Sequence, residues 1–193
     1  IGFDTETIHN SNVKEAWQLI DKVENLQESD SAYIYYSEAL TLLTDQSLKL
    51  SSHPQEIDAF HGALGTVLNE LGTHYVYNGQ TQEALNYKLK SEYVLRYNSR
   101  QSQLAYVYND LGVISDYLGN KKESLTFFVN GIKVAHASSA FEPLALLYSN
   151  IADFFKQAKD YDKALQYHHL ALELQLQVND QMEIAMAHNY IGL

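Results

Sequence analysis

Cysteine is absent from this sequence of 193 residues, which excludes disulfides, thiol catalysis and cysteine-ligated zinc or iron–sulfur sites. Proline and glycine are scarce, at two and nine residues, and their scarcity favours helices because both residues destabilise a helix interior. No apolar run approaches the roughly 20 residues that span a bilayer, and no signal peptide is recognisable. We therefore expect a soluble helical domain, cytoplasmic or periplasmic, without membrane contact.

Positive charge is also in short supply. The 13 lysines and arginines face 24 aspartates and glutamates, which gives a net charge of −11. Residues 1–60 carry most of this excess, with three bases against eleven acids and a net charge of −8. A nucleic acid is therefore not an expected partner. The 46% of hydrophobic residues and 19% of charged residues indicate a chain that folds around a core.

Motifs typical of catalysis or metal binding are missing as well. Eight histidines are present, but none belongs to an H-E-x-x-H motif or to a pair spaced four residues apart. The tandem pair His168-His169 would point in directions about 100° apart on a helix, which is poor geometry for one metal ion. Glycine-rich phosphate loops and a G-x-S-x-G elbow are absent. We predict no catalytic residues, no metal and no cofactor, and keep an enzyme as a remote alternative.

What the sequence does contain is an internal repeat. One short element recurs at a constant offset, as Asn69-Glu70-Leu71-Gly72, Asn109-Asp110-Leu111-Gly112, Ser149-Asn150-Ile151-Ala152 and Asn189-Tyr190-Ile191-Gly192. The same offset relates Gly79, Gly119 and Lys159, and also Tyr87, Phe127 and Tyr167. Self-similarity at a fixed period, here about 40 residues, is the mark of a repeat architecture.

Each unit is predicted to consist of two helices joined by a tight turn. Apolar residues from Leu104 to Leu118 keep the spacing of one helical face. Gly119 suits the left-handed conformation that ends a helix, and Asn120 with Glu123 resembles a capping box that begins the next. Other expected helix starts are Ser139 with Glu142, Asp160, Asp180 with Glu183, and Pro54.

A small residue lies in the middle of each first helix, at Gly72, Gly112, Ala152 and Gly192. Glycine there costs about 1 kcal/mol relative to alanine. We interpret this as a close approach of the two helices of a unit, with Ala84, Ser124 or Ala164 as the small residue on the facing helix.

This pattern resembles the tetratricopeptide repeat. Its elements are Leu68, Leu71-Gly72, Tyr75, Ala84 and Tyr87 in one unit, Tyr108, Leu111-Gly112, Ser124 and Phe128 in the next, and Tyr148, Ile151-Ala152, Phe155, Ala164 and Tyr167 in the third. Departures are a unit that is longer than the usual one of about 34 residues, the lack of a closing proline, and Ser115 at an expected aromatic position. The resemblance implies an all-α fold, a right-handed α-solenoid of antiparallel helix pairs that form a tetratricopeptide-like superhelix.

The resemblance covers about residues 55–193 and leaves an atypical beginning. We predict that residues 1–53 form a divergent helical pair that caps the array, and that residues 54–193 hold three full units plus the first helix of a fourth. The whole would be one continuous domain. The chain begins with Ile1 and ends within an expected helix, so we expect a fragment of a longer protein.

Members of this family bind peptides in a concave groove lined by the first helix of each unit. Carried over by position, this resemblance implies the groove residues Asn69, Thr73, Tyr77, Tyr106, Asn109, Asp116, Tyr117, Ser149, Asp153, Lys156 and Asn189. A carboxamide can pair with the backbone of any extended peptide, which suits the column formed by Asn69, Asn109 and Asn189. Equally open is that these asparagines bond to the neighbouring first helix. Most of the 15 tyrosines are expected to be half-buried packing residues.

Two functions remain at this point. The first is a scaffold that binds a peptide or protein segment, as the regulatory or sensory input module of a larger bacterial signalling protein. The output domain, such as a diguanylate cyclase, a histidine kinase or a transcription regulator, would lie outside this chain. The second is a structural spacer that associates with copies of itself.

Overall fold

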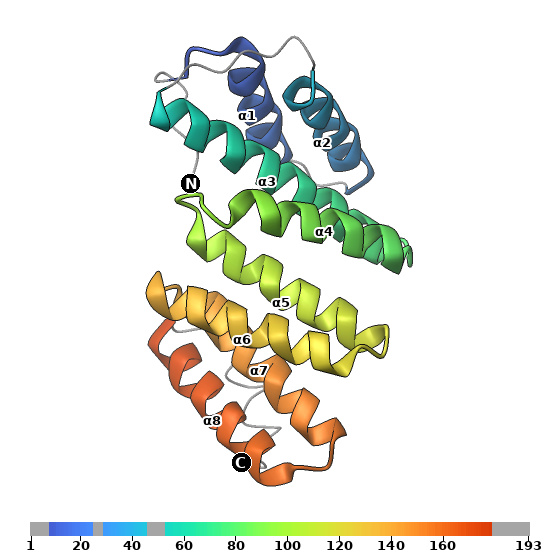
Figure 1. Cartoon of the computed structure of the whole chain (residues 1–193), viewed down its shortest axis with the longest axis vertical. Coiled ribbons are helices and arrows are strands. Elements are labelled where there is room, and N and C mark those ends of the chain that lie inside the picture. The colour runs from blue at the N-terminus through green and yellow to red at the C-terminus, as the bar shows by residue number, and fades with distance from the viewer. Residues whose placement is uncertain (1–7, 25–28, 46–52, 179–193) are drawn as a thin grey trace. The chain divides into compact units, whose positions relative to one another are not determined.

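The computed structural model describes residues 8–24, 29–45 and 53–178, and every regular element within these ranges is a helix. The helices are α1 (Ser11–Glu24), α2 (Ser29–Leu43), α3 (Pro54–Tyr77), α4 (Thr81–Leu95), α5 (Gln101–Tyr117), α6 (Lys121–Ala137), α7 (Phe141–Gln157) and α8 (Tyr161–Val178). Figure 1 shows them as successive pairs, and short turns join the two helices in α3–α4, α5–α6 and α7–α8. The all-α prediction is confirmed, and Pro54 begins α3 as expected.

The chain divides into two compact units, Ile1–Arg100 and Gln101–Leu193, each described here by itself. The first unit holds α1 to α4 and the second holds α5 to α8. The predicted boundary between residues 53 and 54 lies inside the first unit, where α3 packs against both α1 and α2. None of the helices in the described ranges is long and apolar enough to cross a membrane.

The first unit has its core between α1, α2 and α3. Trp17 is 3% exposed and donates its indole N–H to the carbonyl oxygen of Ala59 over 3.1 Å, which ties α1 to α3. The guanidinium of Arg100 lies 4.4 Å from the centre of the Trp17 ring. Alanines and branched residues fill the rest, among them Val13, Ala16, Ala39, Leu43, Ala63, Val67 and Leu71.

In the second unit, a cluster of buried residues lies between α5, α6 and α7. Its buried members are Ala105, Phe128, Ala135, Leu144, Leu147 and Ile151. On α6 the buried residues are seven positions apart, and on α7 they follow at intervals of three and four, which is the spacing that places side chains on one face. The apolar face predicted for residues 104–118 is buried at Leu104, Val107, Tyr108, Leu111 and Ile114, whereas Leu118, just beyond the end of α5, is 38% exposed.

The turns within the helix pairs repeat one backbone geometry. Gly79 and Gly119 have φ values of +71° and +82°, and Lys159 adopts the same region at +62°. The N–H of the residue after each one donates to a carbonyl five residues back: Gln80 to Tyr75 over 2.9 Å, Asn120 to Ser115 over 2.8 Å and Asp160 to Phe155 over 2.9 Å. This is the Schellman arrangement that ends a helix with a left-handed residue. The predicted role of Gly119 is confirmed.

Two of the predicted capping boxes are wrong, although the helix start at Asn120 is confirmed. Asn120 precedes α6, but its side chain makes no capping hydrogen bond, so there is no capping box with Glu123. Ser139 does not begin α7, because it has a φ of +52° and completes the turn after α6, leaving Ala140 as the residue before α7. Asp160 does cap its helix, accepting the N–H of Lys163 over 3.3 Å. The Asp180 and Glu183 start lies outside the described residues.

The close approach within each helix pair is present, but its partner differs from the expected one. A Cβ added at Gly112 would lie 2.3 to 2.8 Å from three ring carbons of Phe128. At Gly72 the added Cβ would lie 3.0 to 3.1 Å from the side-chain carbons of Lys88. The glycines therefore make room for a large side chain on the facing helix, four residues beyond the small residues Ala84 and Ser124.

Candidate functional site

In the first unit, the predicted site residues Asn69, Thr73 and Tyr77 lie along α3 but in different environments. Asn69 is 8% exposed, whereas Tyr77 is 86% exposed at the end of the helix. Thr73 is half-buried and donates its hydroxyl to the carbonyl oxygen of Asn69 over 3.2 Å.

Asn69 and Thr73 hold a lysine that the sequence did not single out. Lys88 on α4 is 1% exposed, and its ammonium group donates to Asn69 Oδ1 over 2.8 Å and to Thr73 Oγ1 over 2.7 Å. The Asn69 carboxamide in turn donates through Nδ2 to Glu70 Oε1 over 2.8 Å. A buried charge needs such partners, because desolvation is costly for an ammonium without hydrogen bonds. These two residues thus have a structural task.

In the second unit, the predicted residues lie on two neighbouring first helices, α5 and α7. Asn109 is 8% exposed and accepts a hydrogen bond at Oδ1 from Nδ2 of Asn150 over 2.7 Å. This is the bond to a neighbouring first helix that the sequence left open. Ser149 and Asp153 are half-buried, and Lys156 is exposed. Asn189 lies outside the described residues. A ligand role for the asparagine column stays a prediction.

Tyr106 also links α5 to α7. Its hydroxyl donates to Glu142 Oε2 over 3.2 Å. Burial, followed by the nearby charge and hydrogen bond of Glu142, raises the pKa of Tyr106 to about 12. This hydroxyl therefore stays protonated and works as a donor throughout the physiological range.

Asp116 and Tyr117 end α5 with contrasting surroundings. Lys121 Nζ lies 2.5 Å from Asp116 Oδ1, donates to Gln157 Oε1 over 2.9 Å, and lies 5.6 Å from the centre of the Phe154 ring. Asp116 is thus paired within its unit. Tyr117, in contrast, is 80% exposed. Tyr77 and Tyr117 occupy equivalent positions in successive repeats, and both present their rings to solvent.

Two ring pairs stack between the helices of a pair, one between α3 and α4 and one between α7 and α8. Tyr75 and Tyr87 stack with ring centres 5.1 Å apart, and Phe155 and Tyr167 stack at 5.7 Å. In the pair α5–α6, Ser115 occupies the position that Tyr75 has in the pair α3–α4. Its hydroxyl is buried and has no hydrogen-bond partner.

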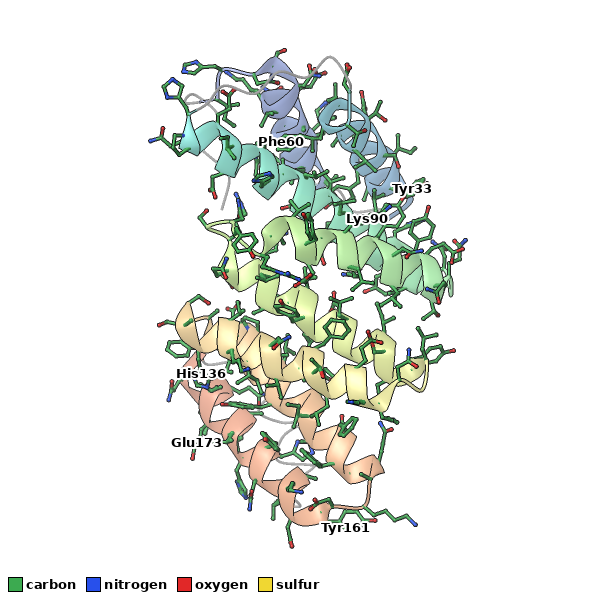
Figure 2. All side chains as sticks on the ribbon, in the orientation of Figure 1. Tyr33, Phe60, Lys90, His136, Tyr161 and Glu173 are labelled. Atoms are coloured by element: carbon green, nitrogen blue, oxygen red, sulfur yellow. The ribbon has the colours of Figure 1, made fainter. Side chains whose placement is uncertain are left out.

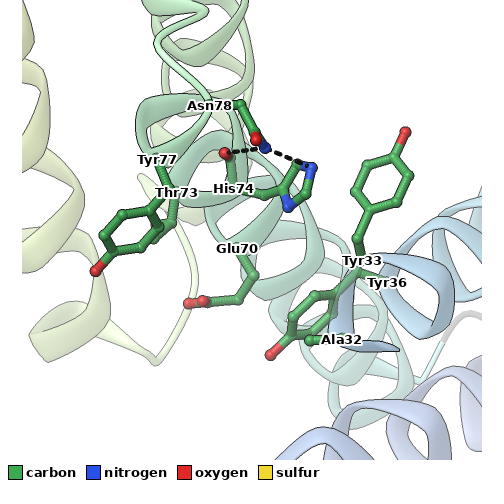
Figure 3. A pocket seen from close by; sticks show the side chains of 8 residues that line it. All are labelled: Ala32, Tyr33, Tyr36, Glu70, Thr73, His74, Tyr77 and Asn78. Atoms are coloured by element: carbon green, nitrogen blue, oxygen red, sulfur yellow. Dashed lines mark hydrogen bonds between the residues drawn. The ribbon is translucent and has the colours of Figure 1, made fainter. Parts of the chain in front are cut away.

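A pocket of about 410 Å³ opens between α2 and the second half of α3, within the first unit. Ala32, Tyr33, Tyr36, Glu70, Thr73, His74, Tyr77 and Asn78 line it (Figure 3). Tyr33, labelled in Figure 2, projects from α2, and its ring stacks on His74 with centres 4.3 Å apart. Thr73 and Tyr77 were predicted site residues, so two of them meet in this pocket.

Sequence reasoning missed Tyr33, Tyr36, Glu70 and His74. The run "YIYY" at residues 33–36 was the available indication, because several tyrosines within one turn of a helix cannot all face a core. This run lies in residues 1–53, which the sequence predicts to be a divergent cap. The pairing of α2 with the far end of α3 is a tertiary contact that periodicity does not reveal.

One further titratable group lies in the second unit. His168 is 5% exposed, and desolvation by burial lowers its pKa, although the charge of Asp153 acts in the opposite direction. It occupies the register of Lys88 and Phe128, one repeat after the latter. Within the described ranges, no group of His, Asp and Glu residues has the arrangement of a metal site.

The described helices thus form tetratricopeptide-like helix pairs, and comparison with solved structures agrees. The chain is similar to BtubC from P. vanneervenii, with a TM-score of 0.64, 15% identity, and coverage of 93% of this chain and 72% of that protein. It is similar to aspartyl phosphate phosphatase F from Bacillus subtilis, with a TM-score of 0.75, 12% identity, and coverage of 93% and 45%.

A third similar structure is a signal transduction ATPase with numerous domains that has a tetratricopeptide repeat sensor, from Pyrococcus horikoshii. Its TM-score is 0.68 at 19% identity, and the match covers 93% of this chain and 26% of that protein. No family model matches the chain, and no curated protein is significantly similar to it in sequence. At sequence identities this low, the structural similarity shows the fold alone. The chain also spans less than half the length of the phosphatase and of the ATPase.

Proposed function

We propose that this chain is a scaffold domain that binds a protein or peptide segment and serves as the regulatory or sensory input module of a larger bacterial signalling protein. Helical repeat arrays act through extended surfaces rather than enclosed active sites, and the fold supports the same use here. The similar ATPase is described as carrying a tetratricopeptide repeat sensor, which is the kind of context we propose. The proposal includes an output domain in that larger protein, such as a diguanylate cyclase, a histidine kinase or a transcription regulator.

The observation that carries this proposal is the pair of exposed rings at equivalent helix ends. Tyr77 and Tyr117 are 86% and 80% exposed, so neither unit needs them for its core. Tyrosine anchors binding partners well, because it combines a large apolar ring with a polar hydroxyl and has little side-chain entropy to lose. Their recurrence at the register of the groove positions favours a binding role for this end of the first helices.

The test is peptide selection on the full chain. A displayed library of random peptides about 12 residues long would be selected against the immobilised chain, and a recovered peptide would then be synthesised with a fluorescent label. We expect the double variant Tyr77→Ala/Tyr117→Ala to weaken binding by about tenfold or more, as for central aromatic anchors. Fluorescence anisotropy measures this change.

A matched control is available in the same chain. Tyr93 and Tyr97 are 74% and 90% exposed but lie outside the predicted groove positions. Tyr93→Ala/Tyr97→Ala should bind the peptide like the unmodified chain, with the same helical circular dichroism. Equal losses in both double variants would refute the groove assignment.

A spacer that associates with itself is the second candidate, and exposed apolar residues on α8 favour it. Tyr161, Leu165 and Leu176 are 64%, 44% and 56% exposed, and Tyr161 projects from the first turn of α8 (Figure 2). Light scattering over a range of concentrations distinguishes the two candidates, because a strict monomer at high concentration contradicts the spacer. The likeness to a phosphatase concerns the fold, and no catalytic activity is transferred from it.

A further inference from the structure

The pocket between α2 and α3 combines aromatic walls with one carboxylate. Rings come from Tyr33 and Tyr36 on α2 and from Tyr77 on α3, and Glu70 supplies the acidic group. In Figure 3 the side chain of Glu70 lies between those of Tyr36 and Tyr77, and its carboxylate points away from the ring of Tyr36. Among the described residues that line the pocket, none is a lysine or an arginine.

Parts of the wall are held in place before any ligand arrives. The ring of Tyr33 stacks on His74 at 4.3 Å with 25° between the ring planes. A side-chain hydrogen bond with Tyr33 is the largest cause that raises the pKa of Tyr75 to about 12. On the other side of His74, Nδ2 of Asn78 lies 2.9 Å from Nε2 and also donates to the His74 carbonyl oxygen over 3.0 Å. A ligand would therefore meet oriented rings, which lowers the entropic cost of binding.

Glu70 supplies the one carboxylate among the described residues that line the pocket. Glu70 has one oxygen engaged by Asn69, and no ion pair between described residues includes Glu70. Lys88 does not line the pocket: it is 1% exposed, and its ammonium group donates to Asn69 and Thr73.

Resting on the function proposed above, we infer that this pocket receives a lysine or arginine side chain of the bound peptide. The faces of tyrosine rings attract a cation, and the carboxylate of Glu70 neutralises it. The same chemistry occurs elsewhere in the chain, where Lys90 lies 5.4 Å from the centre of the Tyr87 ring and Lys22 lies 5.6 Å from that of Tyr35. The net charge of −11 further favours a basic partner.

The test begins with the selected peptides. Aligned sequences recovered on the full chain should share a lysine or arginine at one position. In the synthesised peptide, replacing that residue by norleucine removes the charge and keeps an apolar stem. We expect this replacement to weaken binding to the unmodified chain by about tenfold, from the combined loss of the ring and carboxylate interactions.

Variants of the chain assign this loss to the pocket. With Glu70→Gln, norleucine should cost less than about threefold, since the carboxylate is gone. Glu83→Gln is the matched control, because Glu83 is exposed on α4 and does not line the pocket, and the full tenfold loss should remain there. Tyr36→Leu should weaken the basic peptide by about fivefold through the lost ring face.

The outcomes separate this inference from the function beneath it. Peptides that bind without a shared basic residue, or an equal norleucine cost in Glu70→Gln and the unmodified chain, overturn the inference and leave the scaffold function standing. A selection that recovers no binding peptide overturns the scaffold function, and the inference with it.

Discussion

The helix pairs α3–α4 and α5–α6 occupy the same register in successive repeats, yet they solve the packing beneath their glycine differently. Gly72 faces the flexible stem of Lys88, whose ammonium group is held by hydrogen bonds, while Gly112 faces the rigid ring of Phe128. One pair stacks Tyr75 on Tyr87, and the other has Ser115 at that place. The two pairs thus share a backbone geometry, while the side chain that packs against the glycine is a lysine in one pair and a phenylalanine in the other.

The largest expected effect distinguishes the two glycines. Gly112→Ala would place a Cβ 2.3 Å from a Phe128 ring carbon, and we expect a loss of about 3 kcal/mol in unfolding free energy from overpacking. Gly72→Ala meets only the stem of Lys88 at 3.0 Å, which can shift, and alanine regains about 1 kcal/mol of helix propensity. Gly72→Ala should therefore stay within about 1 kcal/mol of the unmodified chain. Urea denaturation of both variants measures the contrast, and similar losses would show that the two pairs pack alike.

Gly112→Leu should be still less stable than Gly112→Ala, and normal thermal stability of Gly112→Leu would refute the close approach of the two helices.

The second expected effect concerns the buried ammonium group. Lys88→Met keeps an apolar stem of similar length and removes the donor to Asn69 and Thr73, so we expect a loss of about 2 kcal/mol from the stranded buried acceptors. Lys90→Met on the same helix is the control, because Lys90 is exposed, and it should change stability by less than about 0.5 kcal/mol. Should Lys88→Met unfold at the same urea concentration as the control, the hydrogen bonds would contribute no net stability.

The smallest effect compares two buried serines. Ser91 on α4 donates its hydroxyl to the carbonyl oxygen of Gly65 over 2.8 Å, whereas the hydroxyl of Ser115 has no partner. Ser115→Ala should therefore gain about 1 kcal/mol by removing an unpaired polar group, and Ser91→Ala should lose about 1 kcal/mol. Melting temperatures would move in opposite directions. A loss of stability in Ser115→Ala would mean that this hydroxyl is satisfied in solution.

Much of the fold was predictable because the repeat encodes it locally. The constant offset between repeats located the turns at Gly79, Gly119 and Lys159, and all three residues adopt a left-handed conformation. Helix caps were less predictable, since Asn120 has the right residue type and makes no capping bond. A cap depends on a side-chain rotamer, and residue identity alone does not determine it.

The candidate site was predictable only in part. Thr73 and Tyr77 were named from their register, and they lie in the pocket. Its other wall comes from Tyr33 and Tyr36 on α2, in a segment without the repeat pattern. Asn69 illustrates the opposite case, because its register suggested a ligand while its carboxamide bonds to Lys88 and Glu70.

The sequence by itself determined the helices, their turns and the close approach at the glycines, because hydrophobic period, left-handed residues and small residues act over a few positions. The tertiary structure decided which side chain fills the space beside each glycine, which side chains bond to Asn69 and Asn109, and which tyrosines line a pocket. Those outcomes depend on contacts between segments far apart in the chain, such as Tyr33 with His74, and no local pattern specifies them.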